Sequence, residues 1–86
     1  MPQPIAPTAN SVSPAVAALL SQARDCAALD DGLTIALRTL DGAVATDDRA
    51  AAAHLCCFFL SRMGLGERLI EMADTALPLL RKASMS

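Results

Sequence analysis

Residues 48–80 read DRAAAAHLCCFFLSRMGLGERLIEMADTALPLL, and the fold class can be inferred from this segment. Apolar residues recur in it at every third or fourth position, which is the spacing of one face of an α-helix. Ala and Leu, both strong helix formers, dominate the stretch, while the β-branched residues that favour strands are scarce. The sequence therefore predicts an all-α protein.

Two apolar stripes run side by side along this stretch. The first consists of Ala51, Leu55, Phe58, Leu65, Leu69, Met72 and Ala76, and it is interrupted by Arg62. The second consists of Ala52, Cys56, Phe59, Met63, Gly66, Ile70, Ala73, Leu77 and Leu80. Together they cover more than half of the helix circumference, which is wider than the face that one neighbouring helix buries.

The first stripe predicts a partner helix upstream. Ser13 and Pro14 form a helix start, and Gly42 follows Asp41 as a stop signal. The apolar seam between these signals is Val16, Leu19, Ala23, Cys26, Leu33, Leu37 and Leu40, interrupted by Asp30. Since only a short connection joins the two helices, we expect an antiparallel helical hairpin.

The register of this hairpin places the two charged interruptions, Asp30 and Arg62, in the same layer. We expect them to form a structural ion pair that sets the register of the seam. An alternative for the pair is an acid and its modulator in a functional site. In a further alternative, both side chains point to solvent and the coincidence has no meaning.

Glycines leave the number of helices open. Asp30-Asp31-Gly32 could interrupt the first helix, and Met63-Gly64-Leu65-Gly66 could end the second, with Gly64 as a left-handed cap. A break at Gly64 gives three helices, over 14–41, 48–63 and 67–77. Pro78 is expected to end or kink the last helix near Leu77. The expected organisation is a disordered Pro-rich arm over 1–13, the helical domain over 14–80 and a flexible tail over 81–86.

Charge and composition exclude several classes of protein. The net charge is −2 and no basic patch stands out, so nucleic-acid binding is disfavoured. The uncharged run Ala50–Ser61 is too short to span a bilayer. The N-terminus lacks the pattern of a signal peptide, and three cysteines do not form a regular disulfide framework. We expect a cytoplasmic protein.

Residues with chemical potential are few. His54 and Cys57 lie three apart on one helix face, but two ligands are too few for a structural zinc site. No catalytic residue, cofactor or metal is assigned. Ala53-His54-Leu55 resembles the phospho-accepting motif of histidine phosphotransfer domains, which would make His54 the acceptor. Cys56 and Cys57 stand where that family continues with Lys and Gly, which places the resemblance in doubt.

A second resemblance covers residues 14–77. Leu19-Leu20 with Ala23, Leu40-Asp41-Gly42 in the middle, and Met72-Ala73-Asp74 followed by Ala76-Leu77 are together similar to small proteobacterial helical-hairpin proteins of unknown function. Those proteins also carry a Pro-rich N-terminal arm. This is a pattern of apolar periodicity, so it implies a fold and no activity.

The second apolar stripe carries the functional expectation. A stripe left uncovered by the hairpin requires a third helix, a second copy or a partner protein. The predicted interface residues are Cys56, Phe59, Met63, Ile70, Ala73, Leu77 and Leu80. We expect a non-enzymatic protein–protein interaction module, a homodimer or the partner of another protein's helix, that regulates or inhibits another protein. The alternatives are a module that binds an apolar ligand or a membrane surface, and a small phosphotransfer protein that uses His54.

Overall fold

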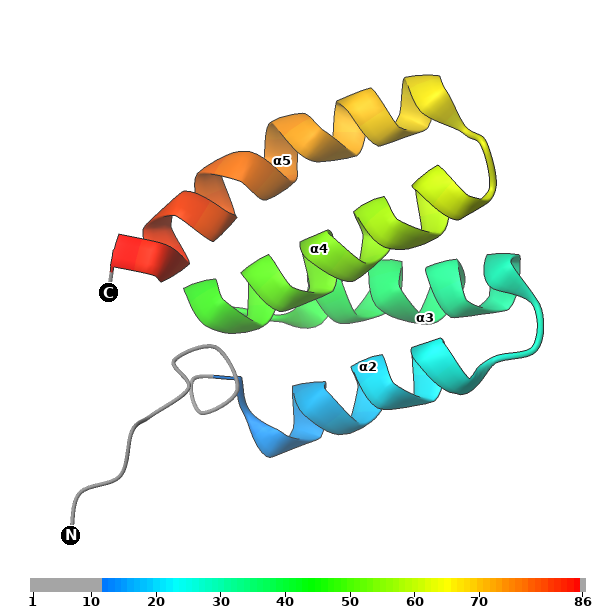
Figure 1. Cartoon of the computed structure of the whole chain (residues 1–86). Coiled ribbons are helices and arrows are strands. Elements are labelled where there is room, and N and C mark those ends of the chain that lie inside the picture. Colours follow the sequence, from blue (N-terminus) through cyan, green and yellow to red (C-terminus); the bar gives the residue numbers. More distant parts are fainter. Residues whose placement is uncertain (1–11, 86) are drawn as a thin grey trace, which may run out of the picture.

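The computed structural model describes residues 12–85 and folds them into four α-helices (Figure 1). They are α2 (Pro14–Asp25), α3 (Leu29–Gly42), α4 (Thr46–Arg62) and α5 (Gly66–Met85). These residues contain no strand, so the all-α prediction is confirmed. The two-helix hairpin is wrong, because each of its long helices is divided into two shorter ones.

The predicted first helix is divided between Asp25 and Leu29. Cys26 and Ala28 both adopt extended backbone conformations there, and α3 then begins with Asp30 and Asp31 in its first turn. Carboxylates are stabilising at that end of a helix, where the backbone N–H groups carry partial positive charge. The acidic pair that could interrupt one long helix therefore begins a new one.

The predicted second helix is divided at Gly64. This residue has a φ of +73°, which places it in the left-handed region that glycine tolerates best. Its N–H donates to the carbonyl oxygen of Ser61 at 3.1 Å, and the N–H of Leu65 donates to that of Leu60 at 3.0 Å. These two bonds form the Schellman motif that ends many helices, so the predicted left-handed cap at Gly64 is confirmed.

The last helix is longer than the sequence indicates. Pro78 lies inside α5, and the helix continues beyond it to Met85. Of the two outcomes expected at Pro78, an end or a kink, the end near Leu77 is therefore wrong, and residues 81–85 of the expected tail are helical. Proline removes one backbone donor, but α5 continues through it while the helix packs on α4.

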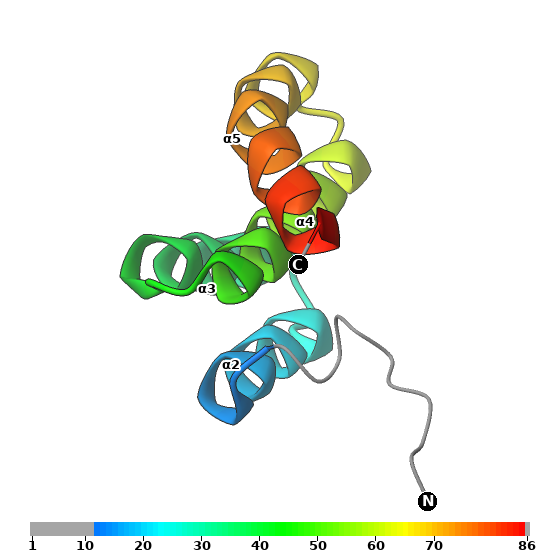
Figure 2. The same ribbon diagram turned by 90° about the vertical axis from the view of Figure 1, so that its left-hand side faces the viewer.

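Helix α4 is the centre of the arrangement. It packs along α5 on one side and along α3 on the other, and α2 packs mainly on α3 (Figures 1 and 2). Consecutive helices run in opposite directions, as the short connections require. The described residues span 44 × 26 × 21 Å. The core consists of Leu20, Ala23, Leu33, Ala36, Leu40, Ala52, Ala53, Leu55, Cys56, Phe59, Leu60 and Ala76.

One polar contact joins the start of α2 to the start of α4. The carboxylate of Asp48 accepts hydrogen bonds from the backbone N–H of Ser13 at 2.8 Å and from its hydroxyl at 3.1 Å. The Ser13 oxygen in turn accepts a long bond of 3.5 Å from the N–H of Val16, as an N-cap residue does. Asp48 is buried, and these contacts satisfy its carboxylate.

Candidate interaction surface

Helix α5 buries one side and exposes a second apolar side. Ala76 belongs to the core cluster, and Leu69, Met72, Leu79 and Leu80 pack against it. Ile70 and Leu77 are 67% and 57% exposed, although both are large and apolar. They are seven residues apart and so lie on the same side of the helix, two turns from one another. Ala73 and Leu80, both partly buried, continue this line along its border with the core; we call Ile70, Ala73, Leu77 and Leu80 the α5 stripe.

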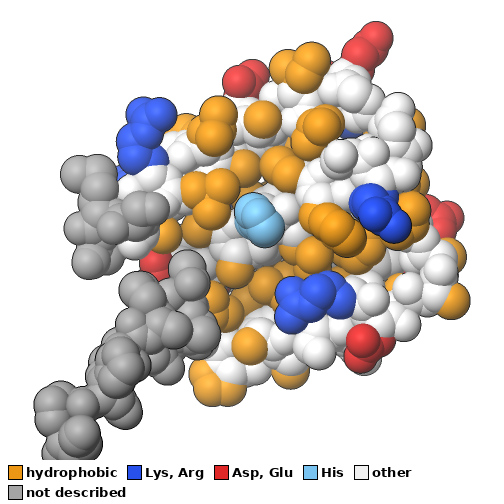
Figure 3. Space-filling view, in the orientation of Figure 1, with side chains coloured by type: hydrophobic (Ala, Val, Ile, Leu, Met, Phe, Trp, Pro, Cys, Tyr) orange, Lys and Arg blue, Asp and Glu red, His pale blue; other side chains and the backbone are white. Residues whose placement is uncertain are grey.

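Helix α4 adds an exposed aromatic ring. Phe58 is 47% exposed, and its ring meets that of the buried Phe59 edge to face, with centroids 5.6 Å apart. The guanidinium of Arg62 lies 5.8 Å from the centroid of the Phe58 ring, within the range of a cation–π contact. His54, one turn before Phe58, is also exposed. Figure 3 shows hydrophobic side chains gathered along α5 and over α4 on the face that carries the histidine.

The structure divides the predicted interface residues into three groups. Ile70 and Leu77 are exposed. Met63, Ala73 and Leu80 are partly buried. Cys56 and Phe59 are 0% and 3% exposed and belong to the core of this subunit, so their assignment to an interface needs correction.

The two adjacent phenylalanines exchange the roles that the sequence predicts for them. Phe58 was expected inside the hairpin seam and Phe59 on the outer stripe. Phe59 instead packs over Gly32 of α3, close to the carbonyl of Ala23 in α2. Because α2 and α3 are separate helices, both reach the side of α4 that carries Phe59. That side of α4 therefore faces the interior, in place of the side that carries Phe58.

Asp30 and Arg62 are both exposed, so neither occupies a buried layer. The contacts that the structure gives them are local. The Asp30 carboxylate accepts a bond of 3.0 Å from the N–H of Asp31, and Arg62 lies over Phe58. The predicted pairing of these charges stays a prediction. An ion pair between two exposed side chains contributes little to stability.

Burial disfavours the thiolate form of two cysteines, Cys56 and Cys57. Burial, with a smaller contribution from the neighbouring Cys57, raises the pKa of Cys56 to about 11. Burial also raises the pKa of Cys57. Since the thiolate is the form that attacks electrophiles and binds metals, both shifts disfavour nucleophilic or metal-binding roles. Within residues 12–85 no three His, Cys, Asp or Glu side chains are grouped closely enough to hold a metal ion.

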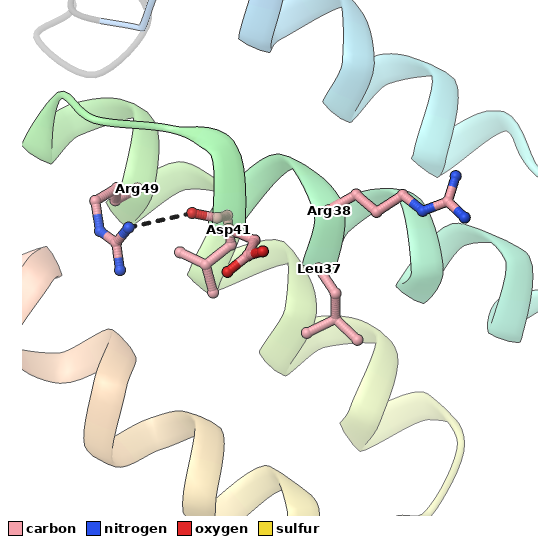
Figure 4. A pocket seen from close by; sticks show the side chains of 5 residues that line it. Leu37, Arg38, Asp41 and Arg49 are labelled. Carbon is pink, nitrogen blue, oxygen red and sulfur yellow. Dashed lines mark hydrogen bonds between the residues drawn. The ribbon is translucent and has the colours of Figure 1, made fainter.

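A shallow depression of about 400 Å³ lies where α3 ends and α4 begins, lined by Leu37, Arg38, Leu40, Asp41 and Arg49. Its two arginines do not converge, since Figure 4 shows Arg38 directed away from Arg49. Arg49 Nη1 donates to the carbonyl oxygens of Leu40 and Ala43, both at 3.2 Å. Arg49 therefore caps the C-terminus of α3, where a cation is favourable, and this contact is structural.

None of the helices over the described residues is long and apolar enough to cross a membrane. Comparisons of the chain with protein-family models, with curated proteins and with solved structures gave no match. The resemblances suggested by the sequence therefore stay expectations. Any functional argument for this protein depends on its own surface, and above all on the exposed apolar side chains of α5 and α4.

Proposed function

We propose that this protein is a non-enzymatic interaction module that associates with itself through the α5 stripe. The single observation that carries the proposal is the exposure of Ile70 and Leu77 on one side of a helix whose neighbouring side is already packed. Large apolar side chains aligned along a helix lose contact with water when another helix covers them, which stabilises the complex. Self-association would then regulate another protein by setting how many copies of this chain are free to bind it.

Self-association fits the size of the chain. A domain of fewer than about 80 residues rarely obtains much stability from one core, and oligomerisation is a common supplement. Within the described region, α5 packs extensively on α4. The exposed side of α5 is therefore available to a second copy of the protein. A second copy would bury Ile70 and Leu77 without rearranging the subunit.

The test is sedimentation equilibrium of the full chain across a concentration series, with Ile70→Gln and Leu77→Gln as variants. We expect a reversible dimer at micromolar concentration that each variant weakens at least tenfold, because burial of such a side chain contributes about 1.5–3 kcal/mol. The matched control is Val44→Gln, which changes an apolar residue that is 91% exposed in the connection between α3 and α4.

The experiment separates the proposal from its alternatives. Loss of the dimer in the α5 variants but not in the control, with unchanged circular dichroism, supports the proposal. A wild-type chain that remains a folded monomer at several hundred micromolar overturns it. Binding of such a monomer to phospholipid vesicles would favour the membrane-surface alternative instead.

A further inference from the structure

We infer that the second copy packs its α5 antiparallel to α5 of the first, with a two-fold axis near Asp74; this inference rests on the proposed function. The α5 stripe has the spacing of a helix–helix seam. Its members follow one another at intervals of three, four and three residues, which is the repeat by which one helix packs along another in a coiled coil. A neighbouring helix that lies nearly along α5 can therefore contact the whole stripe.

Charged residues along one edge of the stripe determine the direction of the partner helix. Glu67, Asp74 and Arg81 are all exposed, and each is seven residues from the next. Each lies three or four positions from Ile70 or Leu77, so the three form a line beside the stripe. The line has an acid at one end and a base at the other, separated by four helical turns.

An antiparallel partner makes this line complementary to itself. In an antiparallel pair, equivalent flanking positions of the two helices face one another, so Glu67 meets the partner's Arg81 and Arg81 meets the partner's Glu67. In a parallel pair, the line would face the opposite flank, which holds Leu69, Ala76 and Ala83 and offers no charge. Flanking charges set the orientation of paired helices, and here they favour the antiparallel one.

The apolar side chains fit the same register. When Glu67 lies opposite the partner's Arg81, Leu77 lies close to the partner's Ala73, so a large side chain meets a small one. The same contact occurs twice because of the symmetry. Large residues that face small ones allow two helices to approach closely and to interdigitate. The centre of the seam therefore pairs Leu77 with the partner's Ala73, and its two ends pair Ile70 with the partner's Leu80.

The axis also places Asp74 beside the partner's Asp74. This like-charge contact weakens the dimer, since it is the one repulsive pair in an otherwise complementary edge. It gives the arrangement a distinctive signature: removal of the charge at position 74 should strengthen association. Glu71, an exposed acid of the same helix that lies off both the stripe and its charged edge, provides the matched control.

The experiment measures the dimer dissociation constant of full-length variants by sedimentation equilibrium at low salt. We expect Glu67→Arg and Arg81→Glu each to weaken the dimer about tenfold, because each reverses two exposed pairs per dimer. The double variant Glu67→Arg/Arg81→Glu should recover to within about threefold of wild type. Asp74→Asn should tighten the dimer severalfold, and Glu71→Gln should change it by less than twofold.

Each result decides for or against the inference. Recovery in the double variant, together with tightening by Asp74→Asn beyond that of Glu71→Gln, supports it. A dimer that Ile70→Gln and Leu77→Gln weaken, but in which the charge exchange gives no recovery, overturns the antiparallel arrangement and leaves the proposed function intact. A chain that does not dimerise contradicts both the antiparallel arrangement and the proposed function.

Discussion

The ring of Phe59 occupies the space that a side chain at Gly32 would need. A Cβ built on Gly32 would lie 2.5 Å from Cζ of Phe59 and 2.7 Å from the carbonyl oxygen of Ala23. Gly32 is therefore a position where α2, α3 and α4 approach one another closely. The absence of a side chain there lets Phe59 replace Phe58 as the interior aromatic residue.

We expect Gly32→Ala to destabilise the protein, even though alanine is the better helix former. The gain in helix propensity is about 1 kcal/mol, whereas the overpacking of a tight core costs about 1–3 kcal/mol and here includes a backbone oxygen that cannot move freely. Urea denaturation measures the difference. The control Gly42→Ala has open space around its Cβ, so it should be neutral or stabilising. A Gly32→Ala protein as stable as wild type would contradict the packing.

The contact between Ser13 and Asp48 should contribute measurably to the stability of the fold. Asp48→Ala removes the acceptor of two hydrogen bonds at a site that is only 8% exposed. We expect a loss of about 1–3 kcal/mol in the free energy of unfolding, measured by urea denaturation. Asp47→Ala, in the same first turn of α4, should lose only the helix-terminus contribution of about 0.3–1 kcal/mol. Equal losses for the two variants would argue against the tie.

Alkaline pH should destabilise the fold through Cys56. Its folded-state pKa of about 11 lies above the ordinary value of 9.0 for a cysteine thiol, so the protonated thiol is favoured in the folded chain. Stability from this group is fully present below pH 9 and is lost as the pH rises through 9 toward 11. The measurement is the melting temperature at several pH values, and Cys56→Ala should remove most of the decline in that window. Alkylation at pH 8 should also reach Cys56 more slowly in folded than in unfolded protein.

The predicted pair of Asp30 and Arg62 can be tested by a double-mutant cycle. Because both side chains are exposed, we expect a coupling energy of only about 0.2–1 kcal/mol between them. Asp30→Arg should also lose the favourable placement of a carboxylate in the first turn of α3, and Arg62→Asp cannot restore that part. Urea denaturation of the two single variants and the double variant gives the coupling. A coupling of zero would show that the charges do not interact.

The sequence predicts where the helices of this protein begin and end better than it predicts which side of each helix faces the core. Ser13 and Pro14 mark the start of α2 correctly because capping depends on a few neighbouring backbone groups, and Gly42 is the last residue of α3. Gly64 is recognisable for the same reason. The Asp30-Asp31-Gly32 interruption is visible too, although the break lies slightly earlier, between Asp25 and Leu29.

The side of α4 that faces the interior could not be read from local pattern. Phe58 and Phe59 are adjacent and chemically identical, so the choice between them depends on which other helices surround α4. That in turn depends on the division of the first helix and on the space left at Gly32. The expectation that two stripes need more than one covering helix is consistent with this arrangement, because α3 and α5 pack on different sides of α4. Cys56 and Phe59 are therefore core residues of the single subunit.

The serial order of packing has a consequence for how the chain opens. Within the described residues α5 is held mainly by α4, while α4 is held from both sides. Local unfolding can therefore release α5 as one cooperative segment while α2, α3 and α4 stay packed together, and hydrogen exchange should then show its amides sharing one opening free energy. Anything that covers the outer side of α5 would slow that exchange, so the terminal helix would report occupancy of its own surface.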